Sequence, residues 1–192
     1  MKKIILISGK AENGKTTAAF EIQRLLKEKG YRAVITRYAK YIKEIAADYC
    51  GWDGSKDEKG RTLLQQLGTE IIKHKLHKND FNVERICDDI EIADDYVDYV
   101  IIDDVRYPNE IYYPIARFGK DKVFTYRVNR CTIDKDGEVI RYQNSLTDEQ
   151  KKHPTETALD NYENWNLISF TSSLKEAAEY AKELVDKILK EE

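Results

Sequence analysis

The stretch GKAENGKT at residues 9–16 follows the apolar run IILI at residues 4–7. It fits the pattern G-x-x-x-x-G-K-[ST], which is typical of a loop that wraps around phosphate groups. The apolar run indicates a buried strand, and residues 16–29 have the composition of a helix. Glycine lets the backbone curl so that successive N–H groups point at an anion, and the helix N-terminus adds partial positive charge there. A glycine turn that fits the pattern by coincidence is the alternative, and the flanking strand and helix argue against it.

The loop predicts a bound nucleotide and a magnesium ion. Lys15 is expected to reach the β- and γ-phosphates, and the Thr16 hydroxyl is expected to bind Mg²⁺. The residues predicted to contact the phosphates are Gly9, Lys10, Asn13, Gly14, Lys15, Thr16 and Thr17.

Strands and helices alternate along the rest of the chain. This order predicts an α/β fold in which helices cover both faces of a mainly parallel sheet. We expect a three-layer α/β/α arrangement with five strands. The predicted strands are 2–8, 32–37, 99–103, 122–128 and 166–170, and the main predicted helices are 15–29, 40–49, 61–75, 81–95, 107–118 and 173–190. A small hairpin is expected around Asp136-Gly137.

Two aspartates and an arginine end the third predicted strand, at the sheet edge where ligands bind in such folds. Asp103 or Asp104 is expected to serve Mg²⁺, with Asp104 preferred. The alternative is that these carboxylates only end the strand or cap a helix. Arg106 is a candidate to clamp a phosphate with two N–H groups, or else to form a salt bridge with Asp104 or Glu110.

Positive charge gathers between residues 127 and 153. Cations that close over the transferred phosphoryl group stabilise its charge and keep water out. We therefore expect a lid at about 129–153, although such a cluster is also compatible with a solvated surface. The cationic residues are Arg127, Arg130, Arg141, Lys151, Lys152 and His153.

A second substrate could contact the helix start that follows the second predicted strand. Lys40 and Lys43 are candidate anion contacts, and Arg61 is a candidate to hold the acceptor phosphate. Trp52 is a candidate to stack on a base, and a core or hinge position is the alternative for it.

Composition narrows the class of protein further. The chain has 192 residues and a net charge of −3, which suggests a single domain, here residues 1–192, without bulk affinity for nucleic acid or anionic membranes. No apolar stretch approaches 18 residues, so no membrane-spanning helix is expected. Three distant cysteines suggest a reducing, cytoplasmic location. Whether the chain forms a homodimer stays open.

Several segments together resemble the phage and bacterial deoxynucleoside monophosphate kinases, over about residues 3–170. The segments that carry the resemblance are SGK with GKT in the loop, YAK at 38–40, WDG at 52–54 followed by KDEKGR at 56–61, LQQLGTE at 64–70, DVRYPNE at 104–110 and HPTETALD at 153–160. The animal-type phosphomevalonate kinases are similar in the same places.

The resemblance implies a nucleoside-monophosphate-kinase-like fold that moves the γ-phosphoryl group of ATP to a (deoxy)nucleoside monophosphate. It also implies an acceptor-binding region at about 38–95. By position, Lys15 and Thr16 would serve the donor and Mg²⁺, Arg61 and Arg106 would hold the acceptor phosphate, and Arg130 and Arg141 would act from the lid. The implied catalytic residues are thus Lys15, Arg106, Arg130 and Arg141. Tyr41 departs from the Asp-Pro-Leu-Lys that relatives carry, so the role of Lys43 stays open.

Two other functions fit part of this pattern. The same chemistry with another phosphorylated metabolite as acceptor would use the same loop and arginines. A switch protein that hydrolyses ATP would need a residue that positions water, and the sequence holds no switch motif of that kind.

Overall fold

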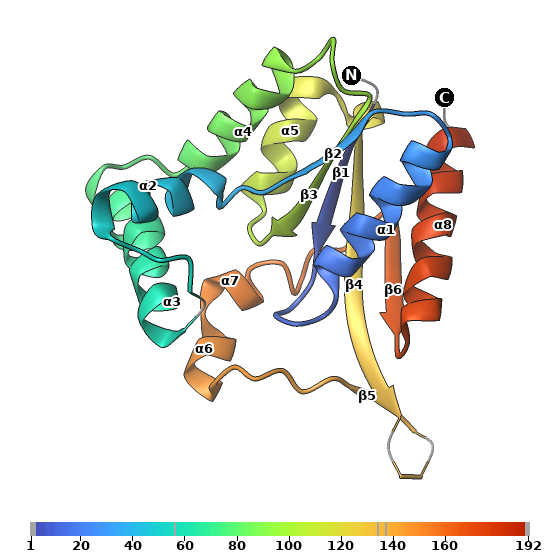
Figure 1. Cartoon of the computed structure of the whole chain (residues 1–192). Coiled ribbons are helices and arrows are strands. Elements are labelled where there is room, and N and C mark those ends of the chain that lie inside the picture. Colours follow the sequence, from blue (N-terminus) through green and yellow to red (C-terminus); the bar gives the residue numbers. More distant parts are fainter. Residues whose placement is uncertain (1–2, 56, 134, 137, 191–192) are drawn as a thin grey trace.

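The computed structural model describes residues 3–55, 57–133, 135–136 and 138–190, without the side chains of Ile133 and Arg141. Its sheet contains five parallel strands in the order β2-β3-β1-β4-β6 (Figure 1). These are β1 (Lys3–Ser8), β2 (Ala33–Thr36), β3 (Tyr99–Val105), β4 (Val123–Ile133) and β6 (Leu167–Thr171). The predicted five-stranded parallel sheet is therefore confirmed.

A sixth, antiparallel strand extends one edge. β4 runs five residues beyond the predicted end at residue 128, and β5 (Val139–Arg141) pairs with its far part. This pair is the expected hairpin, although Gly137 in its predicted turn lies outside the described residues.

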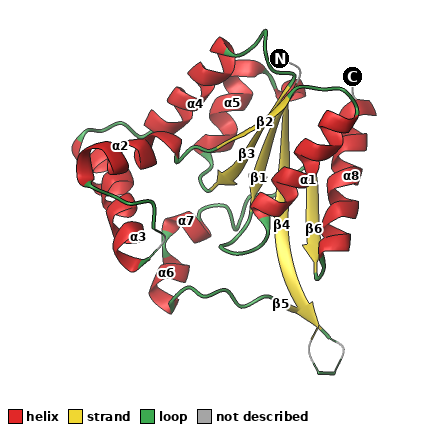
Figure 2. Ribbon diagram, in the orientation of Figure 1, coloured by secondary structure: helices red, strands yellow, loops and turns green. Residues whose placement is uncertain are grey.

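Helices cover both faces of the sheet, as Figure 2 shows. Ile5 and Ile7 of β1 pack with α1 (Lys15–Glu28) and α8 (Leu174–Lys190). Ile4 and Leu6 face the other way, toward α4 (Phe81–Ile92) and α5 (Asn109–Phe118). Because adjacent strand residues point to opposite faces, a strand buried on both sides is apolar throughout, as this one is.

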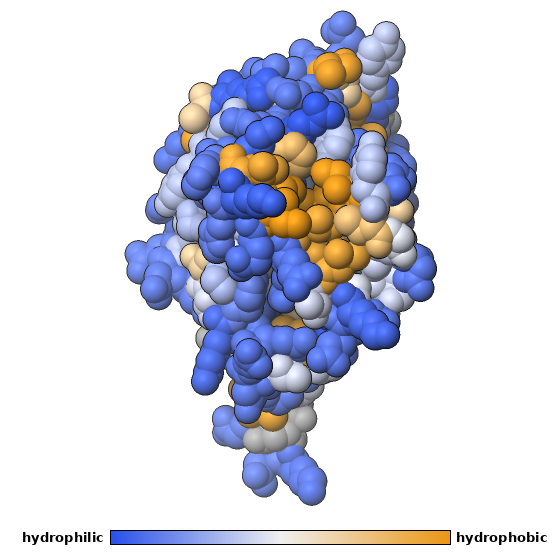
Figure 3. Space-filling model, turned by 90° about the vertical axis from the view of Figure 1, so that its left-hand side faces the viewer, coloured by the Kyte–Doolittle hydropathy of each residue, from blue (hydrophilic) through white to orange (hydrophobic). Residues whose placement is uncertain are grey.

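A smaller helical lobe lies beside the sheet. It consists of α2 (Lys40–Cys50), α3 (Glu58–Gln65) and a π-helix, η1 (Gln66–Lys75). Ile42 and Ala46 of α2 form its core with Leu67 and Ile72 of η1. The sequence predicted one α-helix over 61–75, and the structure changes to π-helical hydrogen bonding at Gln66. Seen from this side of the molecule, apolar side chains gather within a mostly hydrophilic surface (Figure 3).

The remaining elements are short. A 3₁₀ turn, η2 (Lys120–Lys122), precedes β4, and the polar stretch before β6 contains α6 (Asp148–Lys152) and α7 (Pro154–Thr157). Thr147 and Gln150 form a capping box that starts α6. No helix in the described part of the chain is long and apolar enough to cross a membrane.

Candidate active site

The loop between β1 and α1 has the geometry of a phosphate-binding loop. A Cβ atom on Gly9 would lie 2.4 Å from the carbonyl oxygen of Val128, so only glycine fits there. Gly14 has φ of 88° at the start of α1, and no described side chain caps the helix. The first N–H groups of α1 therefore keep their hydrogen-bonding capacity for an anion.

Lys15 folds back over this loop. Its ammonium donates hydrogen bonds to the carbonyl oxygens of Gly9, at 2.9 Å, and Lys10, at 2.7 Å. Burial, followed by the positive charge of Arg106, lowers the pKa of Lys15 to about 7. A phosphate at the loop would favour the charged ammonium and so raise that pKa.

Thr16 contacts Asp103. The Thr16 hydroxyl donates a 2.8 Å hydrogen bond to Oδ2 of Asp103, whose side chain is only 1% exposed. Arg37, at the end of β2, holds the same carboxylate through Nε at 2.6 Å and Nη2 at 2.9 Å. The pair of Asp103 and Thr16 supplies two oxygen ligands of the kind that Mg²⁺ prefers.

Asp104, which the sequence analysis preferred for the metal, lies elsewhere. Its carboxylate accepts the backbone N–H groups of Tyr38, at 2.8 Å, and Ala39, at 3.1 Å, ahead of α2. Burial raises the pKa of Asp104, and Lys43 is among the groups that oppose the rise. The geometry thus favours Asp103 for a metal role, and it gives Asp104 the capping role considered as the alternative.

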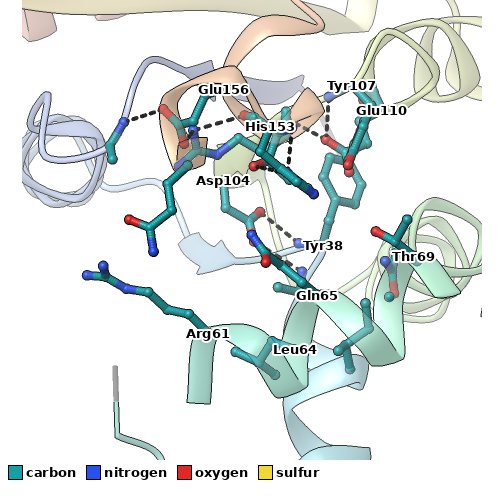
Figure 4. Close-up of a pocket in the computed structure, with 18 of the residues that line it drawn as sticks. Tyr38, Arg61, Leu64, Gln65, Thr69, Asp104, Tyr107, Glu110, His153 and Glu156 are labelled. Atoms are coloured by element: carbon teal, nitrogen blue, oxygen red, sulfur yellow. Dashed lines mark hydrogen bonds and ion pairs between the residues drawn. The ribbon is translucent and has the colours of Figure 1, made fainter. Parts of the chain in front are cut away.

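A cavity of about 500 Å³ opens beside the loop, within the size range of small-molecule sites. Figure 4 shows side chains that enter it from several elements far apart in the sequence. Its lining includes Lys15 of α1, Tyr38, Arg61 and Gln65 of α3, Thr69 of η1, Asp104, Arg106, Glu110 of α5, and His153 and Glu156 near α7.

Arg106 projects into this cavity from the end of β3. Its Nη1 donates to Oε1 of Glu156 at 2.6 Å and to the carbonyl oxygens of Gly9 and Thr155, each at 3.2 Å. The sequence suggested Asp104 or Glu110 as its salt-bridge partner, and this was wrong. Glu110 instead accepts the backbone N–H of Arg106.

Glu110 is a buried carboxyl group at the start of α5. Its Oε2 accepts the N–H groups of Arg106, at 2.6 Å, and Tyr107, at 3.0 Å. Burial raises the pKa of Glu110 to about 8. Lys73, whose pKa is lowered by burial, lies 3.5 Å from the centre of the Tyr107 ring in the same part of the cavity.

The predicted acceptor contacts separate into two groups. Arg61 lines the cavity from α3 (Figure 4). Trp52 does not line it: its ring packs on the core of the helical lobe, and its indole N–H donates to the carbonyl oxygen of Ser55 at 3.0 Å. The core position named as the alternative is therefore the one the structure shows. Lys43 is also absent from the described cavity wall, and Lys40 pairs with Asp89 at 2.9 Å.

The segment that reaches the phosphate loop overlaps the predicted lid at 129–153 only in part. Residues 129–133 and 139–141 belong to β4 and β5, and the part that reaches the loop is the α6–α7 segment, residues 144–160 (Figure 1). Within it, the backbone N–H of Ser145 donates to Glu12 at 3.1 Å, and Asp160 accepts from Lys10 at 2.6 Å.

Of the predicted lid arginines, Arg130 is absent from the described cavity wall. Arg130 is exposed, with its guanidinium 4.0 Å from the centre of the Tyr142 ring. Arg141 ends β5, and its side chain lies outside the described residues. Arg127 donates to the Ser8 hydroxyl at 2.9 Å. In this conformation Arg130 is not placed to contact a group in the cavity.

Two residues that the sequence analysis did not assign belong to the site. Arg37 holds Asp103, and Glu156 holds Arg106. Arg37 gave no signal beyond its place at the end of a predicted strand. Glu156 stands in the segment HPTETALD, which carried the family resemblance without a role for its glutamate.

Comparisons with known proteins give only remote likenesses. No protein-family model matches the chain. No curated protein matches it either. Among solved structures, a mutant of the APS kinase CysC of Mycobacterium tuberculosis is similar at a TM-score of 0.48 and 16% identity, covering 98% of this chain and 97% of that one. The same kinase in complex with AMPPNP and APS is similar at a TM-score of 0.47 and 15% identity, covering 98% of each chain. At these values the likeness is too distant to indicate an activity.

The arrangement itself defines the fold class. A phosphate loop joins a central parallel strand to its helix, and an aspartate at the end of the neighbouring strand contacts the loop threonine. The chain therefore has the α/β fold of P-loop nucleoside triphosphatases. Its site combines an anion cradle, two cations and an adjoining cavity, which is a chemistry suited to phosphate groups.

Proposed function

We propose that the chain is an ATP-dependent kinase that transfers the γ-phosphoryl group to a (deoxy)nucleoside monophosphate, giving the diphosphate and ADP. The observation that carries the proposal is the cavity next to the phosphate loop. Lys15 and Arg106 line it beside the loop residues Ala11 and Glu12, and Arg61 lines it from α3. A donor held by the loop and an acceptor phosphate held between two guanidinium groups would meet at Lys15.

The division of tasks follows from the contacts. The loop amides and Lys15 bind the donor phosphates, and Lys15 stabilises the charge that spreads over the transferred group. Arg106 and Arg61 orient the acceptor phosphate, and the α6–α7 segment limits access of water to the reacting groups. Arg130 would contribute only if the far part of β4 moved toward the cavity.

Mg²⁺ fits this site as the partner of ATP. The Thr16 hydroxyl and the Asp103 carboxylate would hold it, directly or through water. When bound, the ion neutralises phosphate charge during transfer.

A second acceptor class is a phosphorylated metabolite without a base. The cavity is compatible with either class, because Lys73 and the carboxyl groups of Asp104 and Glu110 offer both donors and acceptors of hydrogen bonds there. A nucleotide-hydrolysing switch is a weaker candidate, since a 500 Å³ cavity that meets the phosphate loop suits a second substrate better than a water molecule.

The test is acceptor-dependent release of ADP, measured by a coupled assay with a panel of deoxynucleoside monophosphates, ribonucleoside monophosphates and phosphomevalonate. We expect one of the monophosphates to raise the rate well above ATP hydrolysis alone. Turnover with phosphomevalonate only would move the acceptor to the second class. Hydrolysis that no acceptor accelerates would favour the switch protein.

The acceptor role of Arg106 has its own test. Arg106→Ala should raise the acceptor KM by about tenfold or more, because a charge-assisted contact to phosphate is lost. The KM for ATP should change less. Near-normal acceptor kinetics in this variant would remove Arg106 from the mechanism.

A further inference from the structure

Glu156 is a buried acid in the middle of a cationic site. Its side chain is 7% exposed, and its two carboxylate oxygens have different partners. Oε2 accepts the backbone N–H of Ala11 in the phosphate loop at 2.9 Å, and Oε1 accepts Nη1 of Arg106 at 2.6 Å. One carboxylate therefore joins three parts of the site, namely the loop, the end of β3 and α7.

The hydrogen bonds that hold Arg106 use only one of its three guanidinium nitrogens. All three side-chain hydrogen bonds that the described residues make with Arg106 come from Nη1. Nε and Nη2 make none with that part of the chain, and the side chain lines the cavity with 23% exposure. Because the guanidinium is planar, fixing one nitrogen fixes the direction of the other two.

The main chain around Glu156 strengthens this arrangement. The carbonyl oxygen of Thr155 accepts a hydrogen bond from Nη1 of Arg106, and the carbonyl oxygen of Glu156 accepts one from the Lys10 ammonium. Pro154 begins α7 with His153 as its N-cap, so Thr155 and Glu156 sit in the rigid first turn of a short helix. The position of α7 and the direction of Arg106 are therefore linked.

We infer that Glu156 is a positioning residue: it holds Arg106 with one nitrogen so that the remaining two face the acceptor phosphate, and it couples acceptor binding to the seating of the α6–α7 segment on the loop. The inference rests on the proposed kinase function. The alternative is that the Glu156 carboxylate inhibits binding, because it competes with the substrate phosphate for Arg106. Removing its charge would raise the acceptor KM in the first case and lower it in the second.

Glu156→Gln is the informative variant, because glutamine keeps the shape but presents an NH₂ group to one of two donors. We expect the acceptor KM to rise about tenfold, with the KM for ATP within about twofold of wild type. Glu163→Gln is the matched control: it removes the same charge from an exposed position outside the α6–α7 segment, and we expect wild-type kinetics. An unchanged acceptor KM in Glu156→Gln would overturn the inference. A lowered acceptor KM would also overturn it and would indicate that Glu156 competes with the substrate phosphate.

A thermal-unfolding cycle tests the contact without any substrate. Wild type, Glu156→Gln, Arg106→Lys and the double variant are melted under one condition. Coupled residues should make the double variant's loss in Tm clearly smaller than the sum of the single losses. Additive losses would overturn the inference whatever the kinetics show. If the losses in Tm are coupled but no acceptor is turned over, the proposed kinase function is overturned. The contact between Glu156 and Arg106 is then still supported.

Discussion

The hydroxyl of Thr16 and the carboxylate of Asp103 are joined by a 2.8 Å hydrogen bond between the first turn of α1 and β3. Thr16 is the last residue of the phosphate-loop pattern, and Asp103 lies on the strand next to β1. This contact brings two hard oxygen ligands together at the place where donor phosphates would end. Arg37 fixes the orientation of the Asp103 carboxylate, because its Nε and Nη2 donate to the two carboxylate oxygens.

Asp103→Asn should therefore raise the Mg²⁺ concentration needed for half-maximal turnover by about tenfold or more, because a neutral amide is a poorer ligand for a hard cation. Asp104→Asn is the contrast. It alters a carboxylate that accepts two backbone N–H groups, and we expect it to leave the Mg²⁺ requirement unchanged. The measurement is a Mg²⁺ titration of the rate at fixed ATP. A larger shift in the Asp104 variant would return the metal role to that residue.

Lys15→Ala should lower kcat by about 10²–10³-fold, because the variant loses charge stabilisation of the transferring group. The fold should remain, since among the described residues the ammonium donates only to two loop carbonyl groups. Circular dichroism and the Tm check the fold, and single-turnover kinetics check the chemical step. A variant with near-normal kcat and a higher KM for ATP would assign Lys15 to donor binding alone.

Much of the fold could be predicted because its central strands contain unbroken apolar runs. β1 holds one at residues 4–7 and β3 at residues 99–102, and the phosphate loop fixes which strand and helix meet. The extension of β4 was missed because Asn129 and Arg130 interrupt the apolar pattern just beyond residue 128. The π-helix at Gln66 was missed because apolar spacing over ten residues does not separate it from an α-helix.

The sequence identified the segments that form the site, but it did not identify which side chain of each segment faces it. Asp103 and Asp104 are neighbours on a strand, so they point to opposite faces of the sheet, one toward α1 and the other toward α2. The sequence does not say which face α1 covers, and that fact decides between them. Glu156 was missed for a similar reason, because its partners are about 50 and 145 residues away in the chain.

Trp52→Phe separates a packing role from a substrate role. The indole packs on the core of the helical lobe and donates to Ser55, so the variant should lose one buried hydrogen bond and some packing area. We expect the Tm to fall by a few degrees, since about 1 kcal/mol corresponds to roughly 2–4 °C in a chain of this size. Acceptor preference across the panel should stay as in wild type. A changed preference among bases would place Trp52 near the acceptor after all.

Glu110 gives the protein a predictable pH dependence. Burial raises its pKa from about 4.5 to about 8, so between these pH values the folded state keeps a proton that the unfolded state releases. Stability falls with rising pH where the folded state binds more protons, and the loss from this group is complete above about pH 8. Glu110→Gln keeps an oxygen that accepts the N–H groups of Arg106 and Tyr107 without the charge. Its Tm should therefore decline less than that of wild type between about pH 5 and pH 8.5. Glu149→Gln, at an exposed site, should follow the wild-type curve, and parallel curves for all three proteins would show that Glu110 is ionised throughout this range.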